Sequence, residues 1–259
     1  MTPLGISSFL RTLFRESLCP ALPDGARDPT RVRTTGYHFG MLRTEIDAVL
    51  AEVLRDRRLL AHPFYRRWEA GTLARAELAA YAGQYRHFEA ALPGILERVV
   101  QRIDEPTARR LVQANLDDER GVPAPHLELF NGFAKAVGAP AHADATPGTA
   151  ALLDVYMSGA DESPGSALAA LAAYEVQASE IAASKADGLR ARYGVTDDGA
   201  RFWDVHAGAD EVHGAWIVEA LAALAVDEQQ VRGASSSAAA AWWAFLDERE
   251  ASSPVPVAC

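Results

Sequence analysis

From Met41 to about residue 248, apolar residues recur at spacings of three and four, as they do on the buried face of an α-helix. Residues 46–54 show this pattern in its simplest form. No stretch alternates apolar and polar residues as a half-buried strand does, and no repeat of fixed period occurs. The sequence therefore predicts an all-α fold, a single bundle of seven to eight helices.

The two ends of the chain lack this periodicity. Residues 1–40 are rich in Pro, Gly, Arg and Thr, which predicts a mobile N-terminal extension. Residues 250–259 are predicted to form a disordered tail, so the helical domain should span residues 41–249. Within it we expect further helices at about 76–102, 105–121, 125–137, 149–158, 165–192, 198–224 and 227–248. Pro93 should kink or divide the first of these.

Charge and composition exclude several classes of partner. The formal net charge is −10, and an acidic surface repels phosphate backbones, so we expect no nucleic-acid partner. The two cysteines, Cys19 and Cys259, form neither a disulfide framework nor a thiolate metal site. No apolar stretch reaches the length of a membrane span, and no secretory signal is recognisable. These features predict a cytoplasmic protein without a membrane partner.

Three polar residues near the C-terminal end share one predicted helix face. His206, Asp210 and His213 stand at positions i, i+4 and i+7, and Trp203 and Trp216 flank them. Inward-facing polar side chains need partners, and two imidazoles with a carboxylate suit iron, manganese or zinc. A solvated face or a local Asp–His pair explains the spacing equally well.

Glu175 lies in the middle of an Ala- and Leu-rich helical run. A carboxylate buried there is costly unless it is paired or bound to a metal. The same predicted helix also carries Glu180 and Asp187, so the alternative is that Glu175 faces water.

Glu119 and His126 lie on either side of a short Pro-containing turn. One predicted helix ends at the glutamate and the next begins at the histidine, which brings both side chains near one point. The alternative is an acidic surface run, because Asp117 and Asp118 precede Glu119.

Taken together, these candidates are more informative than any one of them alone. Four helical segments would supply three carboxylates and three histidines, the kind of inward-facing set that di-iron carboxylate bundles use. Thiolates are absent, and mixed oxygen and nitrogen ligation favours iron or manganese over a structural zinc. The predicted metal ligands are Glu119, His126, Glu175, His206, Asp210 and His213.

Several motifs resemble those of haem-oxygenase-like di-iron oxidases over residues 42–246. The spacing of His206, Asp210 and His213 resembles the terminal signature of that superfamily. The opening of that superfamily is matched by His62-Pro63-Phe64-Tyr65-Arg66-Arg67-Trp68, then by Gly71-Thr72-Leu73, Tyr81 and Pro93. Its second-helix signature is matched by Asn115 to Gly121, followed by His126 and Leu129-Phe130. Within the superfamily the chain most resembles the CADD family of para-aminobenzoate synthases, which are linked to folate metabolism. Four further positions carry this likeness, namely Tyr65, Tyr81, Tyr174 and Lys185.

The CADD resemblance implies an unusual oxygenase chemistry, in which a tyrosine of the chain itself becomes the aminobenzoate ring. Carried over, Tyr65 is the leading sacrificial residue and Tyr81 the second candidate. Lys185 would donate nitrogen, and Tyr174 would be a redox or positioning partner. The implied cofactors are two iron ions, or iron with manganese. Molecular oxygen would be the co-substrate, and an external reductant of unknown identity would be required.

Some assignments stay open at this level. Counting back from Gly121 selects Asp118 as the metal ligand, whereas counting back from His126 selects Glu119, which we prefer. Without the resemblance, Tyr65 and Tyr81 read as core aromatics, and Lys185 as a surface residue with a partly buried stem.

Other functions compete with self-sacrifice. The runner-up is a multiple-turnover di-iron oxidase of the same superfamily acting on an external substrate resembling an amino acid or a fatty acid. A metal-free relative and a non-enzymatic helical interaction protein are the remaining alternatives. The sequence sets no oligomeric state, although bundles of this class often pair as homodimers.

Overall fold

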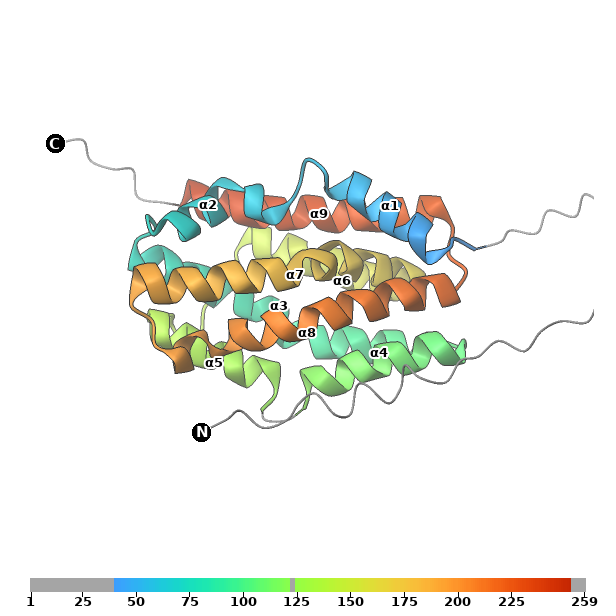
Figure 1. Ribbon diagram of the computed structural model, residues 1–259, viewed down its shortest axis with the longest axis horizontal. Helices are drawn as coiled ribbons and strands as arrows, with labels where there is room; N and C mark the ends of the chain where they lie inside the picture. Colours follow the sequence, from blue (N-terminus) through green and yellow to red (C-terminus); the bar gives the residue numbers. More distant parts are fainter. Residues whose placement is uncertain (1–39, 122–123, 253–259) are drawn as a thin grey trace, which may run out of the picture. The chain divides into compact units, whose positions relative to one another are not determined.

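The computed structural model describes residues 40–121 and 124–252, without the side chains of residues 209–211. The predicted N-terminal extension, apart from Gly40, and residues 253–259 of the predicted tail lie outside the described part. The described residues form helices and connecting turns but no strand, which confirms the all-α prediction. Their elements are α1 (Arg43–Leu54), the 3₁₀ turn η1 (Leu59–Ala61), α2 (Pro63–Ala70), α3 (Arg75–Arg102), α4 (Pro106–Glu119), α5 (His126–Val137), α6 (Pro147–Glu162), α7 (Pro164–Tyr193), α8 (Asp197–Ala223) and α9 (Glu228–Ala251) (Figure 1).

The described part has nine α-helices, one more than the upper end of the predicted range. The additional helix is α2, which has 8 residues and is too short to display a helical period in the sequence. Pro93 lies inside α3 without dividing it, and the alternative of a kink stays a prediction. Leu92, Ile95 and Leu96 are buried beside it. Packing on this face compensates for the hydrogen bond that proline cannot donate.

Helix ends follow local chemistry. Proline occupies the first turn of α2, α4, α6 and α7, where its missing N–H costs nothing. His62 caps α2, because its Nδ1 accepts a hydrogen bond from the backbone N–H of Phe64 at 3.1 Å. Glycines in the left-handed conformation end α2, α5 and α7, which fixes where the following segments begin.

Helix α7 is the most buried long helix and lies between α9 and α8, with α4 and α5 packed against α8 (Figure 1). The pairing of α7 with α8 is the most extensive in the bundle. At Gly214 the two helices come so close that an added Cβ would lie 3.1 Å from the carbonyl oxygen of Glu175. A larger residue at position 214 would therefore push the two helices apart at the level of Glu175.

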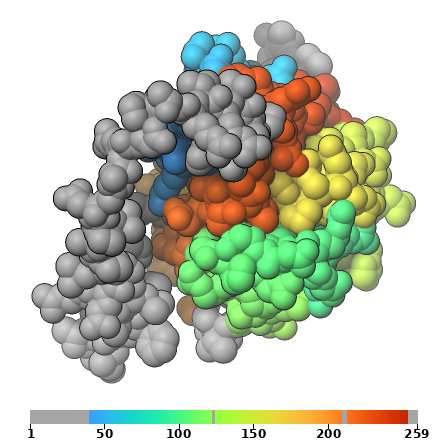
Figure 2. All heavy atoms as spheres, turned by 90° about the vertical axis from the view of Figure 1, so that its right-hand side faces the viewer, coloured from blue at the N-terminus to red at the C-terminus, as the bar shows by residue number. Residues whose placement is uncertain are grey.

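Figure 2 views the bundle from one end, where the surfaces of α4 (green), of α6 (yellow) and of the segment joining α8 to α9 (orange-red) are visible. Among the described residues no helix is long and apolar enough to cross a membrane.

Aromatic side chains are the bulkiest members of the core. One cation, Lys185, belongs to the largest fully buried side chains together with Trp68, Trp203, Trp242, Tyr65, Tyr81, Tyr85, Tyr156, Phe64, Phe88, Phe130 and Phe133. A lysine in such surroundings needs specific partners, because burying an ammonium group without them is very unfavourable.

Candidate metal centre

The connection between α4 and α5 places two of the predicted ligands. Glu119 is the last residue of α4, and His126 is the first residue of α5. Gly121 permits the chain to leave α4 directly after the glutamate, since a Cβ there would lie 2.7 Å from the carbonyl oxygen of Asp117. The two side chains are thereby set on adjoining helix ends that face α8.

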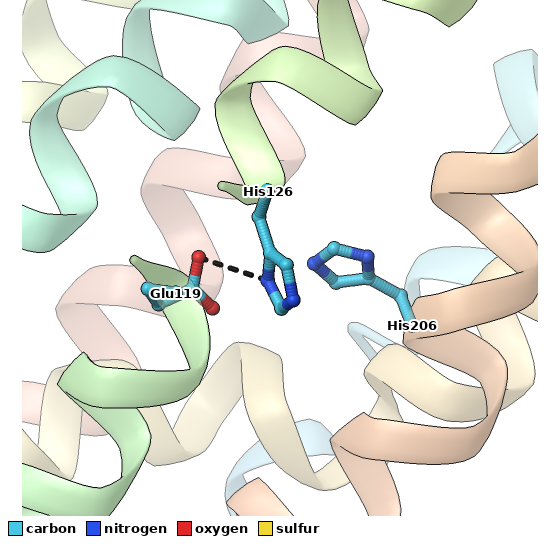
Figure 3. A group of neighbouring side chains, drawn as sticks. All are labelled: Glu119, His126 and His206. Carbon is cyan, nitrogen blue, oxygen red and sulfur yellow. Dashed lines mark ion pairs between the residues drawn. The ribbon is translucent and has the colours of Figure 1, made fainter. Parts of the chain in front are cut away.

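Three buried side chains converge between α4, α5 and α8 (Figure 3). Glu119, His126 and His206 each offer a ligand atom within 4.8 Å of the others. Nδ1 of His126 lies 3.0 Å from Oε2 of Glu119, outside hydrogen-bond geometry. The rings of His126 and His206 have centroids 4.4 Å apart. Two imidazoles held this close, with a carboxylate beside them, form a group suited to binding a cation.

Hydrogen bonds outside this group orient both histidines of α8. Nδ1 of His206 donates to the carbonyl oxygen of Phe202 at 2.8 Å, which leaves Nε2 as the lone-pair nitrogen of the neutral ring. Nε2 of His213 contacts Oδ2 of Asp118 at 3.2 Å. Metal-binding histidines are usually oriented in this way by a carbonyl or a carboxylate at the second nitrogen.

The structure separates the roles of Asp118 and Glu119. The side chain of Glu119 is only 3% exposed and lies in the buried group with His126 and His206. The side chain of Asp118 is 54% exposed and contacts Nε2 of His213. Glu119 is thus placed to bind a metal ion directly, and Asp118 is placed to orient His213.

The remaining predicted ligands come from α7 and α8. Glu175 is buried on α7, and its charge interacts with those of His213, Glu119 and His126. His213 is buried on α8, with its ring centroid 6.4 Å from that of His126. Asp210 belongs to α8, but its side chain lies outside the described part.

The sequence reasoning missed a further buried carboxylate, Glu89 on α3. Its side chain is 3% exposed, and Oε2 has no hydrogen-bond partner among the described residues. Burial raises the pKa of Glu89 well above its usual range, and the neighbouring charges of Glu119 and Glu175 raise it further. The available signal was its position one turn after Tyr85 and two turns after Tyr81 on the same helix face.

Burial and neighbouring charges shift the pKa values of Glu119, Glu175 and His206. Burial raises the pKa of Glu175 to about 7, partly offset by the charge of His213. Burial also lowers the pKa of His206 to about 3, and nearby His126 lowers it further. Burial alone would raise the pKa of Glu119, but its contact with His126 and the charges of His206 and His213 lower it. Two divalent cations would stabilise the ionised carboxylates and neutral imidazoles, so the donor set fits a metal centre.

We predict that metal binding releases protons at mildly acidic pH. Because the pKa of Glu175 is about 7, its carboxyl group is mostly protonated at pH 6 and must ionise before it binds a cation. The apparent affinity should therefore rise with pH up to about pH 7 and then level off, with about one proton or more released per chain at pH 6.

Titration calorimetry with Mn²⁺ in buffers of different ionisation enthalpy measures this release. Glu175→Gln should release about one proton fewer than the wild type at pH 6. A binding heat at pH 6 that is the same in every buffer would show that no proton leaves the site.

Lys185, Tyr65 and Tyr81 form a second polar group, buried among aromatic rings. Nζ of Lys185 donates hydrogen bonds to the hydroxyl groups of Tyr65 at 2.9 Å and Tyr81 at 2.5 Å, and the two hydroxyls are 2.8 Å apart. The same nitrogen lies 4.1 Å from the ring centroid of Trp203 and 4.3 Å from that of Tyr65. The structure therefore brings together three of the four residues that the resemblance singled out.

The fourth residue, Tyr174, connects this group with the metal centre. It precedes Glu175 on α7, and its hydroxyl hydrogen-bonds that of Tyr85 at 2.6 Å. Tyr85 in turn packs against Tyr81, with ring centroids 5.5 Å apart. A continuous set of buried phenols thus runs from the neighbour of Glu175 to Lys185.

Comparison with solved structures defines the class of fold. A CADD-like protein from Nostoc punctiforme superposes with a TM-score of 0.68 at 18% identity, covering 82% of this chain and 98% of that one. A TenA homologue from Pseudomonas syringae also gives a TM-score of 0.68, at 16% identity, with 84% and 98% covered. At these identities the likeness concerns the fold, which is haem-oxygenase-like.

Sequence comparison then defines the family. Residues 79–247 match the family model described as iron-containing redox enzyme. The chain is 37% identical over 213 residues to the 4-aminobenzoate synthase of Nitrosomonas europaea, covering 75% of this chain and 87% of the relative. It is 31% identical over 206 residues to the 4-aminobenzoate synthase of Chlamydia trachomatis, with the same shares covered. The chain belongs to this haem-oxygenase-like family of iron-containing redox enzymes, which confirms the predicted resemblance.

Proposed function

We propose that this protein is an oxygen-dependent 4-aminobenzoate synthase that consumes one of its own tyrosines. Comparing tyrosine with 4-aminobenzoate shows which bonds the reaction must change. The phenolic oxygen of tyrosine leaves as water and is replaced by the nitrogen of a donor amine, whose own C–N bond is cleaved with oxidation of that carbon to an aldehyde. The bond between Cα and Cβ is broken, and Cβ is oxidised to a carboxylate with dioxygen as the oxidant. The reaction needs a nitrogen donor at the phenolic carbon and a strong oxidant at the benzylic carbon.

The observation that carries the proposal is the position of the Lys185 amine. Its Nζ lies within hydrogen-bond distance of two phenolic oxygens, next to the ring carbons that would have to accept nitrogen. A group held this close to its reaction partner gains the large rate advantage of an intramolecular reaction. Lysine can also act as a nucleophile once it loses its proton, whereas arginine stays charged.

Tyr65 is the preferred tyrosine to be consumed. Nζ of Lys185 lies 4.3 Å from the ring centroid of Tyr65 and 4.9 Å from that of Tyr81, so it sits closer over the first ring. Tyr65 belongs to the short helix α2, which contacts fewer elements than α3, the helix that carries Tyr81. Backbone cleavage at α2 would therefore disrupt less packing than cleavage within α3.

The metal centre would supply the oxidising chemistry, because bound iron reacts with dioxygen. We propose that Glu119, His126, Glu175, His206, Asp210 and His213 hold two metal ions, iron with iron or iron with manganese. The contacts of His206 with Phe202 and of His213 with Asp118 keep the imidazole rings in place. Tyr174 and Tyr85 would connect this centre with the Tyr65, Tyr81 and Lys185 group.

The proposal is tested by a reaction with no added substrate. Protein loaded anaerobically with ferrous iron, alone or with Mn²⁺, receives dioxygen and a chemical reductant, and 4-aminobenzoate is quantified by mass spectrometry. We expect a yield of no more than one product per chain, lost in Tyr65→Phe and retained in the control Tyr156→Phe. Oxygen consumption without aminobenzoate would contradict the proposal.

A second candidate is an oxidase that turns over an external small molecule at the same centre. A surface hollow of about 350 Å³ has Glu175 in its wall, together with Val176, Gly214 and Arg43. Such a hollow could admit a small polar substrate, since Arg43 lies in its wall together with the acidic side chains of Asp47 and Glu180. Repeated turnover with an added substrate, undiminished in Tyr65→Phe, would favour this candidate.

A further inference from the structure

Among the residues whose side chains the structure describes, Glu89 is the one buried acid near the candidate metal centre for which neither the sequence motifs nor the proposed reaction provides a role. Its carboxylate is 3% exposed on α3, and one oxygen has no hydrogen-bond partner among the described residues. A buried carboxylate oxygen without a partner is strongly destabilising, so its retention needs a physical explanation.

The position of Glu89 directs it toward the metal centre. It follows Tyr85 by one helical turn, and the hydroxyl of Tyr85 lies 2.6 Å from that of Tyr174, the residue before Glu175. The acidic groups with which it interacts most strongly are Glu119 and Glu175. Three buried carboxylates from α3, α4 and α7 therefore lie near enough for their charges to interact.

Like charges gathered in a buried site repel one another unless cations lie between them. The predicted ligands include three carboxylates, those of Glu119, Glu175 and Asp210. Beside neutral imidazoles, these three leave two divalent cations with an uncompensated positive charge. A fourth carboxylate would neutralise the centre. Neutralising the charge of the two cations would therefore explain why Glu89 is buried, which its hydrogen bonds do not explain.

We propose that Glu89 is a seventh protein ligand of the metal centre, contributed by α3. This inference rests on the proposed function only in taking the site to hold two metal ions. It differs from that function in its test, because metal binding is measured without oxygen and without product.

The test compares Glu89→Gln, which preserves shape and removes the charge, with Glu77→Gln as a matched control. Glu77 is also buried on α3, but it pairs with Arg67 at 2.8 Å and plays no part in the centre. Anaerobic equilibrium dialysis with Fe²⁺ and with Co²⁺ gives stoichiometry and affinity, and the visible spectrum of bound Co²⁺ reports its ligands.

We expect Glu89→Gln to weaken the binding of one of the two ions by at least about tenfold and to shift the Co²⁺ spectrum. Glu77→Gln should bind both ions as wild type does.

Wild-type affinity and an unchanged Co²⁺ spectrum in Glu89→Gln would overturn the inference, as would a wild-type chain that binds no metal. If binding depends on Glu89 but no aminobenzoate forms in the oxygen reaction, the ligand assignment stands and the proposed function fails.

Discussion

Lys185→Met is expected to abolish aminobenzoate formation while leaving a folded, metal-binding protein. Methionine fills most of the space of the lysine stem but offers no nitrogen. The hydroxyls of Tyr65 and Tyr81 keep their mutual hydrogen bond of 2.8 Å. Removing a buried cation also removes its desolvation cost, so the free energy of unfolding should change by no more than about 2 kcal/mol.

The chain offers an unusually clean control for this variant. Of its 25 basic residues counted as Lys and Arg, only Lys135 and Lys185 are lysines. Lys135 is exposed on α5, so Lys135→Met should produce aminobenzoate as wild type does. Lys185→Arg should produce none, since it restores a cation but not an amine that can lose its proton. Aminobenzoate from Lys185→Met at the wild-type yield would exclude Lys185 as the nitrogen donor.

Glu119→Gln is expected to eliminate metal binding at one position and, with it, the consumption of dioxygen. The variant replaces the carboxylate that contacts His126 at 3.0 Å by a neutral amide, which is a poor ligand for iron. The affinity for Fe²⁺ should fall by at least about 100-fold, more than the loss usually caused by changing a residue that only orients a ligand.

The neighbouring carboxylate supplies the matched control. In Asp118→Asn the amide oxygen can still accept a hydrogen bond from Nε2 of His213, so the affinity should fall by no more than about tenfold. Iron content, Fe²⁺ affinity and the rate of oxygen uptake are measured for both variants. If Asp118→Asn proved the more damaging of the two, Asp118 would be the ligand and Glu119 the supporting residue.

Part of the candidate metal centre could be predicted because its residues follow rules of local spacing. The interval between His206 and His213 places both rings on one face of α8, and the short turn after Glu119 brings it close to His126. These relations depend on a single helix or a single connection, and so they are legible in the sequence. The all-α fold was predictable for the same reason, since it follows from apolar periodicity.

Features that depend on contacts between distant segments could not be predicted in this way. Tyr85 and Tyr174 are 89 positions apart, and nothing local indicates that their hydroxyls meet. A single acidic residue such as Glu89 usually marks a solvated helix face, and only the packing of α3 reveals that it is buried. Pro93 illustrates the reverse case, in which packing overrides a local tendency to end a helix.

The central claim is that the chain supplies both the ring and the nitrogen of the product. The most direct test is to prepare the protein with ¹³C-labelled tyrosine rings and ¹⁵N at the lysine side-chain nitrogen, then to react it with iron, dioxygen and reductant. Unlabelled tyrosine and ammonium are present in excess. We expect 4-aminobenzoate that carries both labels, whereas unlabelled 4-aminobenzoate would show that the chain supplies neither the ring nor the nitrogen.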